Sequence, residues 1–216
     1  MKEITKNQIS NFFQRHERLR YLRQAAEAAI AETVARVRRG GKVLICGNGG
    51  SASDSEHIAG ELLKEFRIKR PIPDGYKSRL AELFGAEGEY AASKLQQGIP
   101  AIPLVSQAGI ISAVSNDTSA DMAYAQQVYA YAGKDDVFIG LSTSGNAQNV
   151  YLAACVARSQ GCFNIGFTGE SGGRLKAVSD ALLNVPETET YKVQELHLPL
   201  YHLYCMCIES EMYGEG

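Results

Sequence analysis

A short apolar run that leads into a glycine-rich turn constrains the fold of this chain more than any other feature. Val43 to Cys46 is β-prone and bounded by glycines, which is typical of a buried parallel strand. Gly47-Asn48-Gly49-Gly50-Ser51 follows, and three glycines in four positions allow a sharp turn and a close approach to a ligand. Small hydroxyl and acidic residues then begin a helix, whose free N–H groups attract anions. The stretch predicts a strand, a phosphate-binding turn and a helix.

Strand-like and helix-like segments alternate along the rest of the chain. Further strands are predicted at 99–105, 136–141, 163–168 and 181–185, with helices between them. This alternation predicts an α/β fold, a three-layer sandwich with a five-stranded parallel sheet and right-handed crossovers. Because proline cannot donate to a ladder, Pro100 and Pro103 place the 99–105 strand at an edge of the sheet.

Long helices are predicted at both ends of the chain. Residues 4–39 carry apolar side chains at helical spacing and predict one long helix or two joined ones. Residues 191–213 predict a long apolar helix that Pro199 should kink. Residues 67–98 are interpreted as an insertion, a mobile loop with a short helix, within a single domain that spans 1–216.

Composition narrows the class of protein. A formal net charge of −2 gives no reason to expect nucleic-acid binding. The polar N-terminal segment does not resemble a signal peptide, and no apolar run is long enough for a bilayer. The five cysteines lie mostly in apolar runs without metal-like spacing, so reduced thiols are expected. We therefore expect a cytoplasmic protein that contacts neither nucleic acid nor membrane.

A second polar turn follows the strand at 136–141. Ser142-Thr143-Ser144-Gly145-Asn146 would lie at the carboxyl edge of the sheet, where ligands of open α/β sheets bind. Hydroxyl and N–H groups from two such turns can surround one phosphate without a lysine. A dinucleotide fits less well, because the acidic residue expected about twenty residues after the glycines is missing, and a P-loop would need Gly-Lys-Ser/Thr.

Polar side chains on two helices supply candidate chemistry. His57 and Glu61 are four residues apart and therefore share one face of the helix that the first turn begins. Gln194, His197 and His202 interrupt the apolar C-terminal helix. An imidazole and a carboxylate near a phosphate suit proton transfer or metal binding. The plainer alternatives are a surface pair for the first two residues and satisfied core histidines for the others.

Taken in order, these motifs resemble the sugar isomerase (SIS) domain family, and within it the phosphoheptose isomerases. The motifs are Gly47-Asn48-Gly49-Gly50-Ser51, Glu56-His57-x-x-x-Glu61, Asn116-Asp117, Ser142-Thr143-Ser144-Gly145-Asn146, Thr168-Gly169 with Gly172-Gly173, and Gln194-Glu195-x-His197-x-x-x-x-His202. The likeness covers nearly the whole chain except the insertion.

The resemblance implies a flavodoxin-like SIS fold and an aldose-ketose isomerase of a phosphorylated sugar, with sedoheptulose 7-phosphate as the best-matched substrate. It also implies a homotetramer with active sites at subunit interfaces and a zinc ion in each site. Glu61 and His202 would be catalytic, and the metal-site residues would be His57, Glu61, Gln194 and His202. The implied substrate-binding residues are Asn48, Gly49, Gly50, Ser51, Asn116, Asp117, Ser142, Thr143, Ser144 and Gln194.

A second class of protein is also consistent with the motifs. It is a non-catalytic, sugar-phosphate-binding or partner-binding regulator, like the relatives that associate with the bacterial replication initiator. Those relatives share the fold but lack a full acid/base set, notably the last histidine. Because Glu61 and His202 are both present, the sequence favours the enzyme.

Overall fold

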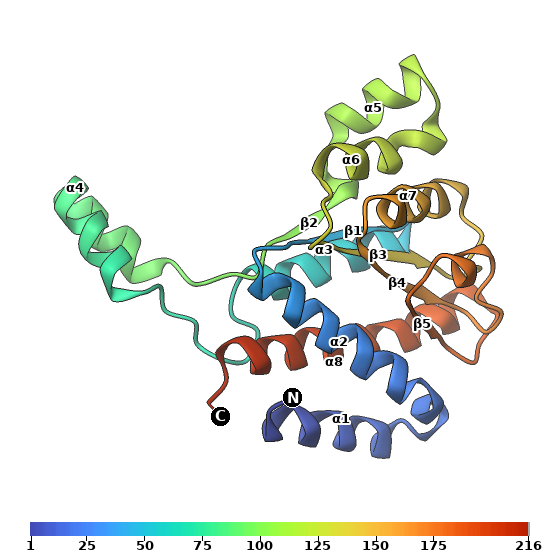
Figure 1. Ribbon diagram of the computed structural model, residues 1–216, viewed down its shortest axis with the longest axis horizontal. Coiled ribbons are helices and arrows are strands. Elements are labelled where there is room, and N and C mark those ends of the chain that lie inside the picture. The colour runs from blue at the N-terminus through green and yellow to red at the C-terminus, as the bar shows by residue number, and fades with distance from the viewer. Residues whose placement is uncertain (216) are drawn as a thin grey trace.

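Five parallel strands form the central layer of the computed structural model, which describes residues 1–215 (Figure 1). Their order across the sheet is β2-β1-β3-β4-β5. The strands are β1 (Val43–Cys46), β2 (Ala101–Pro103), β3 (Val137–Ser142), β4 (Phe163–Thr168) and β5 (Ala181–Asn184). The predicted five-stranded parallel sheet is confirmed, with the proline-flanked strand at its edge.

Helices cover both faces of the sheet and bury two separate cores (Figure 1). Val43 and Ile45 pack on one side, and Leu44 and Cys46 on the other, because successive strand residues point to opposite faces. β1 is therefore apolar without interruption. The first core involves α1 (Glu3–Arg15), α2 (Arg23–Arg38), α3 (Gly50–Leu63) and α8 (Thr190–Tyr213), and the second α6 (Ala123–Tyr131) and α7 (Gln148–Ser159).

The two terminal segments pack together on one face of the sheet. Residues 4–39 form two helices, α1 and α2, joined by a 3-10 turn at Glu17–Leu22, which is the second of the two predicted forms. The backbone N–H of Lys2 donates to Glu211 Oε1 at 2.6 Å, so the start of α1 contacts the end of α8. α8 continues as one helix through Pro199. Among residues 1–215, no helix is both long and apolar enough to cross a bilayer.

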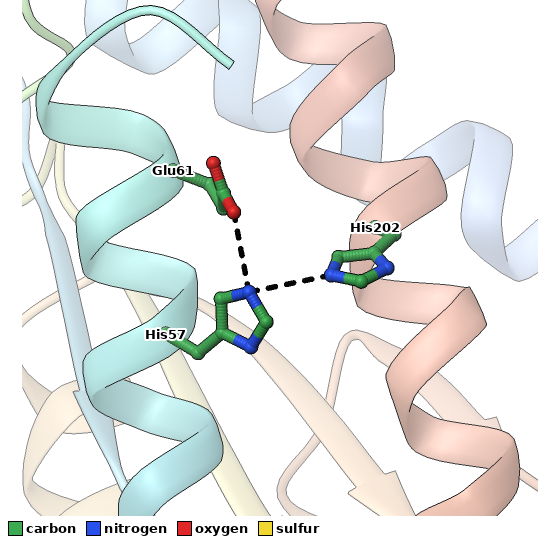
Figure 2. A group of neighbouring side chains, drawn as sticks. All are labelled: His57, Glu61 and His202. Atoms are coloured by element: carbon green, nitrogen blue, oxygen red, sulfur yellow. Dashed lines mark hydrogen bonds and ion pairs between the residues drawn. The ribbon is translucent and has the colours of Figure 1, made fainter.

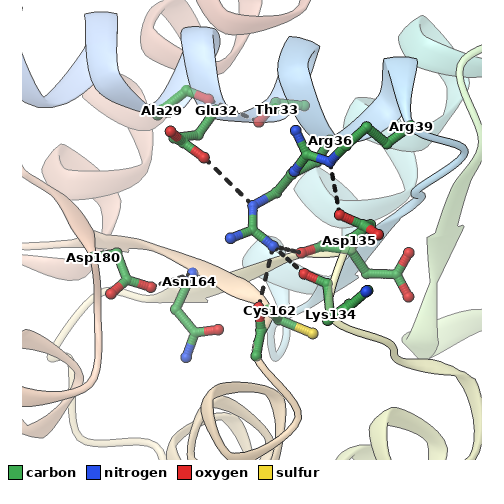
Figure 3. A network of polar contacts seen from close by, with 12 residues as sticks. Ala29, Glu32, Thr33, Arg36, Arg39, Lys134, Asp135, Cys162, Asn164 and Asp180 are labelled. Atoms are coloured by element: carbon green, nitrogen blue, oxygen red, sulfur yellow. Dashed lines mark hydrogen bonds and ion pairs between the residues drawn. The ribbon is translucent and has the colours of Figure 1, made fainter.

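Two arginines at the end of α2 form hydrogen bonds with the loops that precede β3 and β4 (Figure 3). The Arg36 guanidinium donates to the carbonyls of Asp136 at 3.3 Å and Gly161 at 3.1 Å, and also to that of Lys134. Arg39 Nε lies 2.8 Å from Asp135 Oδ1. These contacts stabilise the amino-terminal edge of the sheet, which leaves the carboxyl edge for the two polar turns.

Residues 67–98 contain a helical hairpin, so the predicted loop with a short helix is wrong for most of this segment. α4 (Asp74–Lys94) breaks at Gly85, whose φ of 54° lets the chain reverse. The second half then packs so closely that a Cβ at Gly88 would collide with the Leu80 carbonyl. The hairpin projects from the rest of the protein (Figure 1). Four of its large apolar side chains are more than half exposed: Tyr76 (53%), Leu83 (60%), Phe84 (61%) and Tyr90 (65%).

The second helical layer is completed by α5 (Ala108–Asp117), which lies beside α6 (Figure 1). Short 3-10 turns at Leu104–Ser106 and Ala120–Met122 lead into α5 and α6, and a third, at Arg174–Ala177, precedes β5.

Candidate active site

The two polar turns meet at the carboxyl edge of the sheet because β1 and β3 are neighbouring parallel strands. A cavity of about 260 Å³ lies between them. It is lined by all the residues expected to bind substrate except Asn116 and Asp117: Asn48, Gly49, Gly50, Ser51, Ser142, Thr143, Ser144 and Gln194, together with Leu141, Ala147 and Thr190. The lining within the described residues is neutral, so an anion there would depend on hydroxyl, amide and backbone N–H donors.

Two glycines of the first turn have distinct roles. Gly49 has a φ of 56°, a left-handed conformation that side chains disfavour. A Cβ at Gly50 would lie 2.5 Å from Gln194 Nε2, so glycine lets this flexible amide approach the backbone closely. α3 begins at Gly50, and its first turn contains the buried Ser51. The turn thus brings α8 against the helix N-terminus at the edge of the cavity.

The second turn is held by its own hydroxyl groups. Ser144 Oγ accepts the Asn146 N–H at 3.1 Å, and Ser142 Oγ accepts the Ala147 N–H at 3.3 Å. Gly145 has a φ of 68°, and a Cβ there would collide with the carbonyl of Gly172. The Gly172-Gly173 pair therefore allows the loop after β4 to support the second turn.

Asn48 is oriented by a residue that the sequence analysis did not identify. Its side-chain amide exchanges two hydrogen bonds with that of Asn149, at 2.9 Å and 3.0 Å. Tyr124 OH donates to the neighbouring Gly47 carbonyl at 2.9 Å. The position of Asn149 in the sequence does not predict this contact, because the contact depends on which strands of the sheet are neighbours.

Asn116 and Asp117 lie away from the cavity between the turns. They end α5, and Asn116 Nδ2 donates to Asp117 Oδ1 at 2.8 Å. Both side chains are exposed. Their expected role toward the sugar hydroxyls stays a prediction.

His57, Glu61 and His202 form a compact group between α3 and α8 (Figure 2). His57 Nε2 lies 3.2 Å from Glu61 Oε1 and 3.4 Å from His202 Nε2. One ligand atom from each residue lies within 4.8 Å of the others. Imidazole nitrogen and carboxylate oxygen are zinc ligands, and facing lone pairs repel unless a cation or proton separates them. The donor set therefore fits a metal ion.

Gln194 lies two helical turns before His202 on α8 and lines the cavity between the two polar turns. The same helix therefore contributes to both parts of the site. Its place as a further metal ligand stays a prediction, since its amide packs against Gly50 here.

Burial and neighbouring charge affect the two histidines of α8 differently. Burial, followed by nearby His57, lowers the pKa of His202, against an opposing effect of Glu61. A neutral imidazole is thereby favoured at His202, which is the form needed to accept a proton or bind a metal. His197 is fully buried, and its Nε2 lies 3.1 Å from the Thr168 carbonyl. It is a core residue, as in the plainer alternative, but among residues 1–215 its Nδ1 has no hydrogen-bond partner.

His197 should make the protein less stable in acid. Burial lowers its pKa from the ordinary value of 6.5 to about 4. As pH falls below 6.5 the unfolded chain takes up the proton first, so stability is lost down to about pH 4, by about 3 kcal/mol. Urea unfolding across this range should show the loss, and it should shrink in His197→Gln, whose amide donates without titrating. Equal pH slopes for both proteins would contradict this assignment.

Two further pairs near the site were missed by the sequence analysis. Tyr201 OH contacts Asp54 Oδ1 at 3.0 Å and His57 Nδ1 at 3.1 Å. Arg70 forms a buried ion pair with Glu209 at 2.8 Å. Asp54 lies three residues before His57 and so shares its helix face, which is the only local signal among the four residues.

The fold, the paired serine turns and the His/Glu group define a protein of the SIS-domain class, and the family model described as SIS domain matches residues 80–169. Among relatives, a phosphoheptose isomerase of Trichlorobacter lovleyi is 39% identical over 191 residues, covering 87% of this chain and 84% of its own length. That of Helicobacter hepaticus is 34% identical and covers 100% of this chain and 97% of its own. The chain belongs to the phosphoheptose isomerase family.

Solved structures agree with this assignment. A phosphoheptose isomerase from Francisella tularensis superposes with a TM-score of 0.74 at 28% identity, covering 97% of this chain and 100% of that chain. One from Neisseria gonorrhoeae gives 0.72 at 29% identity, covering 96% and 98%. The Helicobacter alignment spans this whole chain, so the likeness also includes the hairpin segment that the sequence analysis left out.

Proposed function

We propose that the protein is an aldose-ketose isomerase that interconverts sedoheptulose 7-phosphate and a heptose 7-phosphate. The observation that carries this proposal is that two helices link the cavity to the His/Glu group. α3 begins at the first serine turn and carries His57 and Glu61, and α8 carries Gln194 and His202. A sugar whose phosphate lies between the turns would therefore extend toward acid/base residues. Relatives named phosphoheptose isomerase support the choice of substrate.

Glu61 and His202 can divide the proton transfers of this reaction. Glu61 would take a proton from C1 of the ketose and return it to C2. Neutral His202 would move a proton between the two neighbouring sugar oxygens. Oε1 of Glu61 faces His57, which leaves Oε2 for the substrate. C1 and its oxygen each lose one proton while C2 and its oxygen each gain one, so the sugar is isomerised without an external oxidant.

A zinc ion is the proposed cofactor, held by His57, Glu61 and His202 with Gln194 as the fourth residue. When bound it would polarise the sugar carbonyl as a Lewis acid. Support comes from the three converging ligand atoms and their chemistry.

A homotetramer with shared active sites and a cytoplasmic location complete the proposal. The exposed aromatic and leucine side chains of the hairpin support contact with other subunits, because patches of this kind mark protein interfaces. The cysteines within residues 1–215 are free thiols, which suits a reducing compartment.

The alternative, a non-catalytic regulator, is less favoured because Glu61 and His202 are present and lie in one group. The deciding experiment supplies the purified, zinc-loaded protein with sedoheptulose 7-phosphate and follows aldose formation. We expect turnover that a chelator abolishes and zinc restores, and sedimentation velocity should give four times the chain mass. A zinc-loaded protein that isomerises no heptose, hexose or pentose phosphate would refute the enzyme.

A further inference from the structure

The hydroxyl of Tyr201 lies between a carboxylate and the imidazole of His57. Its oxygen is 3.0 Å from Asp54 Oδ1 and 3.1 Å from His57 Nδ1. Tyr201 is buried on α8, next to His202 in the chain, whereas Asp54 and His57 lie on α3. The two helices are therefore joined by a hydrogen-bonded chain directly behind the His/Glu group.

The protons available to each group decide which one donates in these two hydrogen bonds. A tyrosine hydroxyl has one proton to donate, and an ionised carboxylate can only accept. The Tyr201 proton therefore goes to Asp54, and the phenolic oxygen accepts the N–H of His57 Nδ1. His57 Nε2 is left with a free lone pair, and this is the atom that faces Glu61 Oε1 and His202 Nε2.

We propose that Tyr201 is a positioning residue that, with Asp54, fixes His57 as the Nδ1–H tautomer and directs its Nε2 toward the metal. Histidine ligands of metals commonly donate their other ring N–H to a partner that sets the tautomer and the ring orientation. This inference rests on the proposed metal site but not on the identity of the sugar.

The surroundings of Asp54 support a specific role for its hydrogen bond with Tyr201. Among residues 1–215, Asp54 Oδ2 is buried without a hydrogen-bond partner, and the Tyr201 hydroxyl is the donor that reaches the other oxygen. Burying one carboxylate oxygen without a donor is unfavourable. Packing alone gives no reason for it, whereas orienting a metal-binding imidazole does.

Tyr204, one turn later on α8, provides a matched control. It is as buried as Tyr201, and its hydroxyl lies 2.8 Å from Thr33 Oγ1, within the core and away from the His/Glu group. Tyr201→Phe and Tyr204→Phe each remove one buried hydroxyl from the same helix. Only the first removes the partner of His57.

The test measures zinc affinity of the metal-free protein without substrate, by competition with a chromophoric chelator. We expect Tyr201→Phe to weaken zinc binding about 10- to 100-fold and Tyr204→Phe to leave it unchanged. Equal affinities for the two variants would overturn the inference, as would a wild-type protein that binds no zinc. Because sugar takes no part, failure of the proposed isomerase activity would not affect the result.

A second measurement reads the tautomer itself. ¹⁵N spectra of the imidazoles, recorded at pH 8 on zinc-loaded and metal-free protein, should show His57 protonated on Nδ1 in the wild type and in Tyr204→Phe. In Tyr201→Phe without metal, we expect a mixture of the two tautomers. A wild-type proton on Nε2 would mean that a protonated Asp54 donates to the Tyr201 hydroxyl and that this hydroxyl donates to His57 Nδ1. The inference would then be wrong.

Discussion

Replacing Glu61 by Gln is expected to lower kcat by about 10²- to 10⁴-fold while leaving the fold intact. The amide has the size of the carboxylate and can still contact His57, which lies 3.2 Å away. It cannot take a proton from carbon, so the step assigned to Glu61 would stop. The measurement is steady-state turnover of sedoheptulose 7-phosphate, with circular dichroism and thermal unfolding as checks on the fold.

Glu17→Gln supplies the matched control for this substitution. Its side chain is 76% exposed on the turn between α1 and α2, and within residues 1–215 it pairs only with Arg20, at 3.3 Å. Turnover should stay at the wild-type level there. Zinc and sugar-phosphate binding by Glu61→Gln are measured in parallel, since a binding protein would keep its function. A variant with full turnover and a normal fold would exclude Glu61 as the base.

The fold could be predicted from sequence where local signals are strong. The uninterrupted apolar run Val43–Cys46 and the two polar turns that follow strands identify a parallel sheet with a site at one edge. That the turns share one cavity depends on β1 lying next to β3, which is a tertiary fact. His57 and Glu61 were paired by helical spacing, but the closeness of His202, 141 residues beyond Glu61, could only be taken from the family resemblance.

The contacts that could not be predicted join residues that are far apart in the sequence. Tyr201 and Asp54 are 147 residues apart, and Arg70 and Glu209 are 139 apart. Neither pair has a spacing that would distinguish it from ordinary charged and aromatic residues. Within residues 67–98, the reversal of the chain at Gly85 is shown only by the structure, through the φ of Gly85 and the contact between Gly88 and Leu80.

Arg70 connects the base of the hairpin to the helix that carries Glu61. Both members of its ion pair with Glu209 are buried, with side chains 0% and 1% exposed. Arg70 also donates to the carbonyls of Leu62 at 2.8 Å and Glu61 at 3.3 Å. Glu209 in turn accepts the backbone N–H groups of Phe66 and Arg67. The pair thus holds the end of α3 and the chain that follows it against α8.

Arg70→Met should lower the free energy of unfolding by about 3–5 kcal/mol, because it leaves Glu209 as a buried charge without its partner. Urea unfolding measures this loss, and Arg23→Met is the matched control. Arg23 pairs with Glu27 at 2.9 Å on the partly exposed surface of α2, where such pairs contribute about 0–1 kcal/mol.

Arg70→Met/Glu209→Gln should lose less stability than the sum of its two single variants, since removing both charges leaves neither one unpaired. The carbonyl of Glu61 still loses its Arg70 donor in the double variant, so turnover should remain reduced in the fraction that is folded. An Arg70→Met protein within about 1 kcal/mol of wild type would show that water reaches this pair, because only a solvated pair is that weak. Normal turnover in the folded double variant would instead show that α8 holds the end of α3 in place without Arg70.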